Sequence, residues 1–150
     1  MLFTTGQLRS AFGLSKQQWR SYREALPPLA KDHSRSGCFS AADLLATSVV
    51  HKINTSLSMP LPAFTGTAMP LFELCAAHPW PQLERSSVAI DFESRRVELV
   101  GHECHIPPAA VALLIELAPL VVELRERLLA SIPDPQGDLA FPPMIARSRR

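Results

Sequence analysis

A chain of 150 residues has room for one ordinary domain, or for two very small ones that share a core. Hydrophobic residues make up 47% of the chain and charged residues 19%, which excludes wholesale disorder and supports a packed core. The sequence has no apolar run that could span a bilayer and no signal-peptide pattern at its start. Three widely separated cysteines suit reduced thiols, so we expect a cytoplasmic protein.

The net charge of +1 conceals an uneven distribution. Residues 1–60 carry seven Lys and Arg against three Asp and Glu, whereas residues 61–130 carry five against nine. This asymmetry favours a front half that binds a polyanion and a back half with a different role. An ordinary surface with uneven charge is the alternative.

Three helix starts are predicted in the front half by one local pattern, in which Ser or Thr is followed three residues later by Gln or Asp. In such a capping box the hydroxyl accepts from a free amide of the first turn, and the later side chain reaches back to the cap. The three boxes begin at Thr4, Ser15 and Ser40.

The first two helices are expected to form a helix-turn-helix. Gly13 stands between them and can adopt the left-handed conformation that ends a helix. The second helix is predicted over residues 16–25, because Pro27 and Pro28 follow it. Its polar side chains suit contacts with phosphates and base edges. They are Lys16, Gln17, Gln18, Arg20 and Arg23.

Residues 29–39 are polar, basic and rich in turn-forming residues. This segment, which includes Lys31, Arg35 and Gly37, has the length of a small hairpin wing beside the second helix. A plain basic loop is the alternative.

The order and spacing of these residues resemble the N-terminal winged helix-turn-helix of the MerR family of bacterial regulators. The resemblance covers roughly residues 2–65 and departs from the family at Ser21 and Gly37, where the family has an aromatic residue and the wing arginine. The matching stretches are Phe3-Thr4-Thr5-Gly6-Gln7-Leu8, Gly13-Leu14-Ser15, Trp19-Arg20-Ser21-Tyr22-Arg23-Glu24 and Phe39-Ser40-Ala41-Ala42-Asp43-Leu44-Leu45.

This resemblance implies a DNA-binding domain over residues 1–60. By the family's pattern, Lys16, Gln17 and Arg20 would lie in or beside the major groove. Tyr22 and Arg35, the latter in place of the wing arginine, would contact backbone phosphates. Arg9 and Arg23 complete the expected set of phosphate anchors.

The back half is predicted to contain a connector, a short helix and a β-hairpin. Prolines interrupt residues 60–70, so this stretch has the pattern of a connector, followed by a helix over residues 71–77. Apolar and polar residues alternate over residues 87–92 and again over residues 96–100, which is typical of a hairpin.

Residues 107–131 have the most helical pattern of the chain and are predicted to form a long C-terminal helix, which Pro119 would kink or split into two. Its first half is apolar nearly all round and has to be covered on several faces. We therefore expect a homodimer formed through this helix, although a core helix within one subunit is the alternative. Residues 70–131 would then be a dimerisation or partner-binding unit, and residues 132–150 a flexible tail.

Little in the sequence indicates catalysis, because it has no glycine-rich phosphate loop and no nucleophile motif. The one cluster with metal-ligand chemistry is His102, Cys104 and His105, which Cys75 and His78 could complete. Its spacing differs from that of structural zinc sites, so we expect no metal and no cofactor.

The expected fold class is α+β, mostly α: a winged helix-turn-helix followed by a small unit with a β-hairpin and a long C-terminal helix. The expected function is that of a homodimeric, DNA-binding transcriptional regulator on a pseudo-palindromic operator, and not that of an enzyme. The alternatives are a protein–protein adaptor or anti-activator, and an excisionase-like architectural DNA-binding protein of a mobile element.

Overall fold

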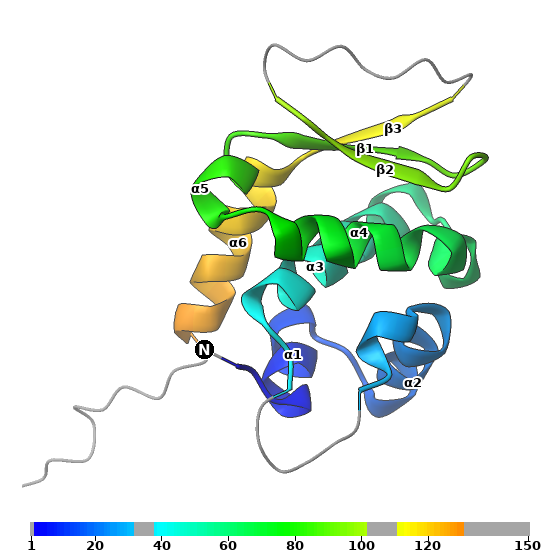
Figure 1. The fold of residues 1–150 in the computed structure, drawn as a ribbon. Coiled ribbons are helices and arrows are strands. Elements are labelled where there is room, and N and C mark those ends of the chain that lie inside the picture. Colours follow the sequence, from blue (N-terminus) through cyan, green and yellow to red (C-terminus); the bar gives the residue numbers. More distant parts are fainter. Residues whose placement is uncertain (1, 32–37, 102–110, 131–150) are drawn as a thin grey trace, which may run out of the picture.

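The computed structural model describes residues 2–31, 38–101 and 111–130 (Figure 1). The described residues form a mostly helical α+β fold, as the sequence predicts, with a small antiparallel sheet. Its helices are α1 (Thr5–Phe12), α2 (Lys16–Ala25), α3 (Ala41–Leu57), α4 (Thr65–Ala77), α5 (Trp80–Leu83) and α6 (Leu117–Ala130). Its strands are β1 (Ser87–Asp91), β2 (Arg96–Val100) and β3 (Leu113–Glu116).

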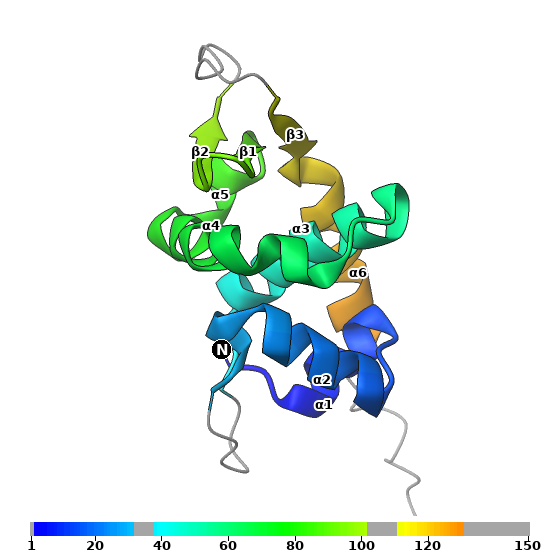
Figure 2. The same ribbon diagram turned by 90° about the vertical axis from the view of Figure 1, so that its right-hand side faces the viewer.

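The elements lie in three levels, which Figures 1 and 2 show from two sides. Helices α1 and α2 form one end of the molecule, the sheet forms the other, and α3 and α4 lie between them. Helix α6 runs along one side from the sheet to α1 and packs against both α1 and α3.

All three predicted capping boxes are confirmed. The amides of Gln7, Gln18 and Asp43 donate to the hydroxyls of the three caps at 3.1–3.2 Å. Each of these three side chains also returns to the backbone of its cap. Gly13 has a φ of 63°, the left-handed conformation expected at the turn between α1 and α2.

The segment that precedes α3 returns to the N-terminus of the chain. Phe3 and Phe39 form an antiparallel bridge, in which the Phe3 amide donates to the Phe39 carbonyl at 2.7 Å. Residues 32–37, the middle of the predicted wing with Arg35, lie outside the described residues. A 3-10 turn at Pro27–Leu29, which the sequence did not indicate, precedes them.

The predicted connector at residues 60–70 is wrong from residue 65 onward, whereas the helix predicted over residues 71–77 is confirmed as the second half of α4. Leu61–Phe64 form a 3-10 turn, and α4 begins at Thr65 with Pro70 inside it. Proline in a helix interior costs about 3 kcal/mol. Burial of several large side chains at about 1.5–3 kcal/mol each outweighs that cost. These side chains are Phe64, Leu71, Phe72 and Cys75.

The hairpin is confirmed, but the predicted helix over residues 107–131 is wrong at residues 113–116, which form a strand, and residues 107–110 lie outside the described residues. Strand β3 pairs with β1, placing Leu113 opposite Ile90 and Ile115 opposite Val88. The strand order is therefore β2-β1-β3. Successive side chains of a strand point to opposite faces of the sheet. A stretch that forms a strand therefore need not confine its apolar residues to one helical face, which explains why this stretch is apolar nearly all round. Pro119 lies in the first turn of α6, where a missing amide costs little, so it makes no kink.

A single hydrophobic core joins the two halves. It contains Leu8, Trp19 and Phe39 from the front half together with Leu71 and Leu124 from the back half. Helix α6 buries its apolar face within its own subunit, which agrees with the alternative prediction of a core helix and not with that of a helix buried by dimerisation. Of the helices in the described residues, none combines the length and the hydropathy that a transmembrane segment requires.

Candidate nucleic-acid interface

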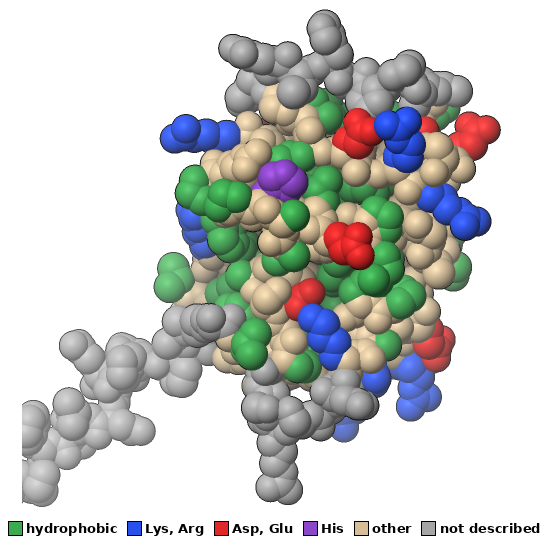
Figure 3. Space-filling model, in the orientation of Figure 1, with side chains coloured by type: hydrophobic (Ala, Val, Ile, Leu, Met, Phe, Trp, Pro, Cys, Tyr) green, Lys and Arg blue, Asp and Glu red, His purple; other side chains and the backbone are tan. Residues whose placement is uncertain are grey.

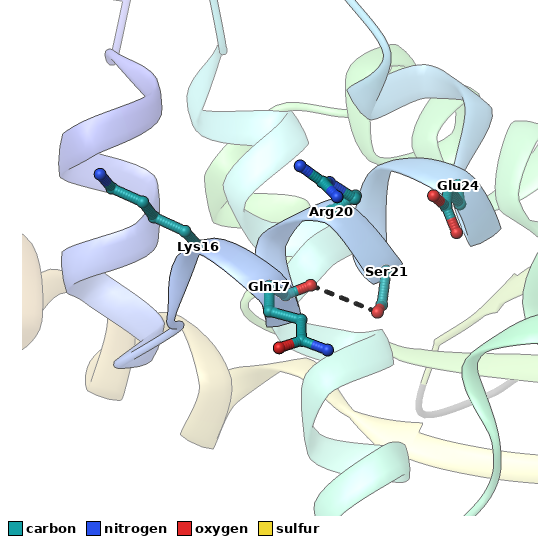
Figure 4. A pocket seen from close by; sticks show the side chains of 5 residues that line it. All are labelled: Lys16, Gln17, Arg20, Ser21 and Glu24. Atoms are coloured by element: carbon teal, nitrogen blue, oxygen red, sulfur yellow. Dashed lines mark hydrogen bonds between the residues drawn. The ribbon is translucent and has the colours of Figure 1, made fainter.

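Helix α2 has one buried face and one exposed face. Trp19, Tyr22 and Ala25 are buried, and the Trp19 ring meets the Phe39 ring edge-on at 5.7 Å between centroids. This packing fixes how the helix is rotated on the core. The opposite face lines an open depression with five side chains (Figure 4). They are Lys16, Gln17, Arg20, Ser21 and Glu24.

The structure brings Lys16, Gln17 and Arg20 together on this exposed face, as the sequence predicts (Figure 4). Within the part of the chain that the structure describes, neither Lys16 nor Arg20 forms an ion pair. In Figure 3 blue side chains gather at the lower edge, the end at which Figure 1 shows α2. These cations are therefore available to an external anion.

Gln18 is exposed, but its side chain is part of the helix cap. Its Oε1 accepts from the Ser15 amide at 2.9 Å, which leaves the side-chain amide as its only group for an external contact. The Gln17 side chain forms no hydrogen bond with any described residue, and its backbone carbonyl oxygen accepts from the Ser21 hydroxyl at 3.3 Å. Gln17 is therefore better placed than Gln18 to read a base edge.

Arg9 and Arg23 are half-buried, in the last turn of α1 and the last turn of α2 respectively. A guanidinium nitrogen of Arg9 donates to the Leu14 carbonyl at 3.3 Å, which ties α1 to the residue that follows Gly13. The Nε atoms of both arginines are buried without a partner among the described residues. Arg9 thus supports the turn, and both arginines add positive charge to the helix-turn-helix.

Tyr22 is not on the exposed face. Its side chain is 3% exposed, and its hydroxyl lies 2.8 Å from Nδ1 of His51 on α3. Burial raises the pKa of Tyr22 to about 12, so the hydroxyl keeps its proton. Tyr22 therefore packs in the core and forms a hydrogen bond inside the protein. Its hydroxyl is not exposed for the phosphate contact that the family resemblance implies.

The sequence interpretation overlooked Ser21 and Glu24. Both lie one turn after Gln17 and Arg20, and the helical spacing i, i+4 could have found them. Glu24 places one negative charge at the end of the face that carries Lys16 and Arg20. A nucleic acid bound there would meet both signs of charge.

No metal centre is formed by the described residues, since they bring no three His, Cys, Asp or Glu side chains together. Cys75 is 1% exposed, and burial raises the pKa of its thiol to about 12, so it stays protonated. His78 Nδ1 lies 2.9 Å from the Leu74 carbonyl oxygen. His102, Cys104 and His105 lie outside the described residues. No protein-family model, no curated protein and no solved structure matches this chain.

Proposed function

We propose that the protein binds double-stranded DNA through α1, the turn at Gly13 and α2, with α2 in the major groove. The observation that carries this proposal is the exposed face of α2. Lys16, Gln17 and Arg20 stand on it without an ion pair among the described residues, while the Trp19 face fixes the orientation of the helix. The resemblance to the MerR winged helix-turn-helix supports the same assignment.

In this proposal each side chain has a role that follows from its chemistry. Lys16 at the start of α2 neutralises a phosphate, and Arg20 one turn later donates two hydrogen bonds to a guanine edge. Gln17 pairs with an adenine edge. The 10 residues of α2 span about 15 Å, which suits a groove about 12 Å wide.

We propose further that the protein is a cytoplasmic transcriptional regulator that binds a pseudo-palindromic operator as a homodimer. Leu117, Leu120 and Leu124, which belong to the apolar stripe that first suggested a dimer, are buried inside the subunit, so the support comes from apolar residues of α6 that stay exposed. Val122 and Leu129 are 48% and 68% exposed and lie seven residues apart on this helix. A second copy of the chain that covers these residues would place a second α2 helix on the other half-site of the operator.

The test is the binding of the full-length protein to a fluorescent duplex from the region upstream of its own gene, measured by anisotropy over a range of salt concentrations. We expect affinity to fall steeply with salt. Arg20→Ala should weaken binding by about 1–3 kcal/mol and relax the preference for guanine at one position of the operator. Its control is Arg85→Ala, which removes an exposed arginine from the connection between α5 and β1.

The outcomes separate the proposed role from its alternatives. Equal losses in Arg20→Ala and Arg85→Ala would contradict the α2 interface. A protein that binds no DNA even at low salt would favour an adaptor that works through its acidic half. Binding that bends the duplex without regulating a promoter would favour an architectural role. Mass measurement in solution, with Val122→Glu as the variant, tests the dimer.

A further inference from the structure

A second polar site lies away from the α2 face, where α1, α3 and α6 meet. A cavity of about 100 Å³ opens there, several times the space that one water molecule needs. Helix α3 contributes four residues at the helical spacing i, i+3, i+4, i+7, so one face of that helix forms a wall. The lining residues are Phe12, Ser48, His51, Lys52, Thr55, Leu120, Glu123 and Arg127.

Three hydrogen-bond donors on the α3 wall are not used by the described part of the protein. The Ser48 hydroxyl and the Lys52 ammonium have no hydrogen bond or ion pair among the described residues. The third donor is Nε2 of His51. By contrast, Thr55 already donates to the His51 carbonyl at 2.8 Å.

The hydrogen bond with Tyr22 determines which ring nitrogen of His51 carries the proton. The Tyr22 hydroxyl keeps its proton and lies 2.8 Å from His51 Nδ1, so it can donate to that nitrogen. A neutral imidazole that accepts at Nδ1 carries its proton on Nε2. The second nitrogen of the ring is therefore a donor.

The charges around the cavity favour an anion. Arg127 and Glu123 of α6 form an ion pair with each other across one turn, so they largely cancel. Lys52 then leaves a net positive charge at the rim. Burial lowers the pKa of His51, the charge of Arg127 lowers it further, and Lys52 acts in the same direction against Glu123. A bound anion would offset these positive charges.

We propose that this cavity binds a small oxyanion of the phosphate type, held by the Ser48 hydroxyl, the Nε2–H of His51 and the Lys52 ammonium. Such donors form short, charge-assisted bonds to an oxyanion. The site adjoins both helices of the helix-turn-helix, since His51 meets Tyr22 of α2 and Arg127 donates to the Ala11 carbonyl of α1 at 2.9 Å. The anion would thus stabilise the junction between the front and back halves.

The test uses inorganic phosphate and the full-length protein without DNA, so its result does not depend on the DNA-binding proposal. The imidazole resonances of His51 are followed by NMR through a pH titration in sodium phosphate and in sodium chloride of the same ionic strength. We expect phosphate to raise the pKa of His51 by about one unit, which corresponds to about tenfold tighter binding to the protonated form.

Matched variants locate the site. Lys52→Gln and Ser48→Ala should each reduce the response of His51 to phosphate, while Arg85→Gln, which removes one positive charge from the connection between α5 and β1, should leave it unchanged. Circular dichroism checks that each variant is folded. Identical His51 titrations in phosphate and chloride, or equal effects of Lys52→Gln and Arg85→Gln, would overturn the proposal.

Discussion

The front and back halves of this protein begin their helices in different ways. Each of α1, α2 and α3 starts at a side-chain capping box. Helices α4 and α5 start without any side-chain cap bond, and α4 contains a proline. The front helices are thus specified by residues next to them in sequence, whereas the back helices depend on the surface that they bury. Local signals and tertiary packing carry different shares of the fold in the two halves.

The two halves also differ in how their cations are used. Three arginines of the back half pair with carboxylates: Arg96 with Glu98 at 2.5 Å, Arg125 with Glu84 at 2.9 Å, and Arg127 with Glu123. In the front half Lys31 pairs with Asp43 at 2.6 Å, but Lys16 and Arg20 form no ion pair with any residue that the structure describes. For the proposed binding of DNA, the asymmetry that matters is therefore the unpaired charge on α2 and not the net charge of each half.

The largest expected effect tests whether the halves fold as one unit. Leu124 of α6 is 1% exposed in the shared core, so Leu124→Ala should lower the free energy of unfolding by about 2–5 kcal/mol. Amide hydrogen exchange should show that α2 and β1 lose protection together. Leu57→Ala, at a side chain that is 56% exposed, is the control. Loss of protection in the back half alone would mean that the halves are independent.

The next effect isolates the local signals of the front half with a pair of glycines. Gly13→Ala should cost about 1–2 kcal/mol, because an L-residue resists a φ of 63°. Gly6→Ala should be neutral or stabilising by up to about 1 kcal/mol, since Gly6 lies in the first turn of α1 and its nearest neighbour, Thr4 Oγ1, is 3.7 Å from an added Cβ. Urea denaturation measures both. Equal effects would show that the turn does not depend on Gly13.

A smaller effect concerns the junction of the halves and its response to pH. Burial and the charge of Arg127 hold the pKa of His51 below its ordinary 6.5, so the unfolded chain binds its proton more readily than the folded one. The resulting stability is complete above pH 6.5 and is lost as the pH falls through the lower folded-state pKa. His51→Gln should flatten this part of the pH–stability curve, measured by thermal unfolding. An unchanged slope would remove His51 as the cause.

The smallest expected effect sharpens the charge comparison on α2. Glu24 shares the exposed face with Lys16 and Arg20, and its carboxylate would repel a phosphate backbone. Glu24→Gln should raise DNA affinity by a few-fold, with the largest gain at low salt, because exposed charges are screened. Glu73→Gln, at an exposed position of α4, controls for the change in net charge. A gain of the same size in both variants would indicate a general charge effect.

The parts of the fold that could be predicted from sequence are those with local causes. The caps at Thr4, Ser15 and Ser40 and the turn at Gly13 involve residues at most a few positions apart, and the hairpin alternates at period two. For the candidate site, the exposed face of α2 followed from helical spacing. The hydrogen bond between Tyr22 and His51 did not, because His51 is 29 residues away in the chain.

The tertiary structure alone decided the secondary structure of stretches in which the local preference is weak or misleading. The sequence pattern predicts a connector at residues 65–70, but these residues are helical because α4 packs on α3. The pattern predicts a helix at residues 113–116, but these residues form a strand because they pair with β1. An apolar run does not itself distinguish a buried strand from a buried helix. The sequence alone determined where the front helices begin and which face of α2 carries charge. Long-range burial and pairing decided the rest, because the free energy that selects those elements comes from partners elsewhere in the chain.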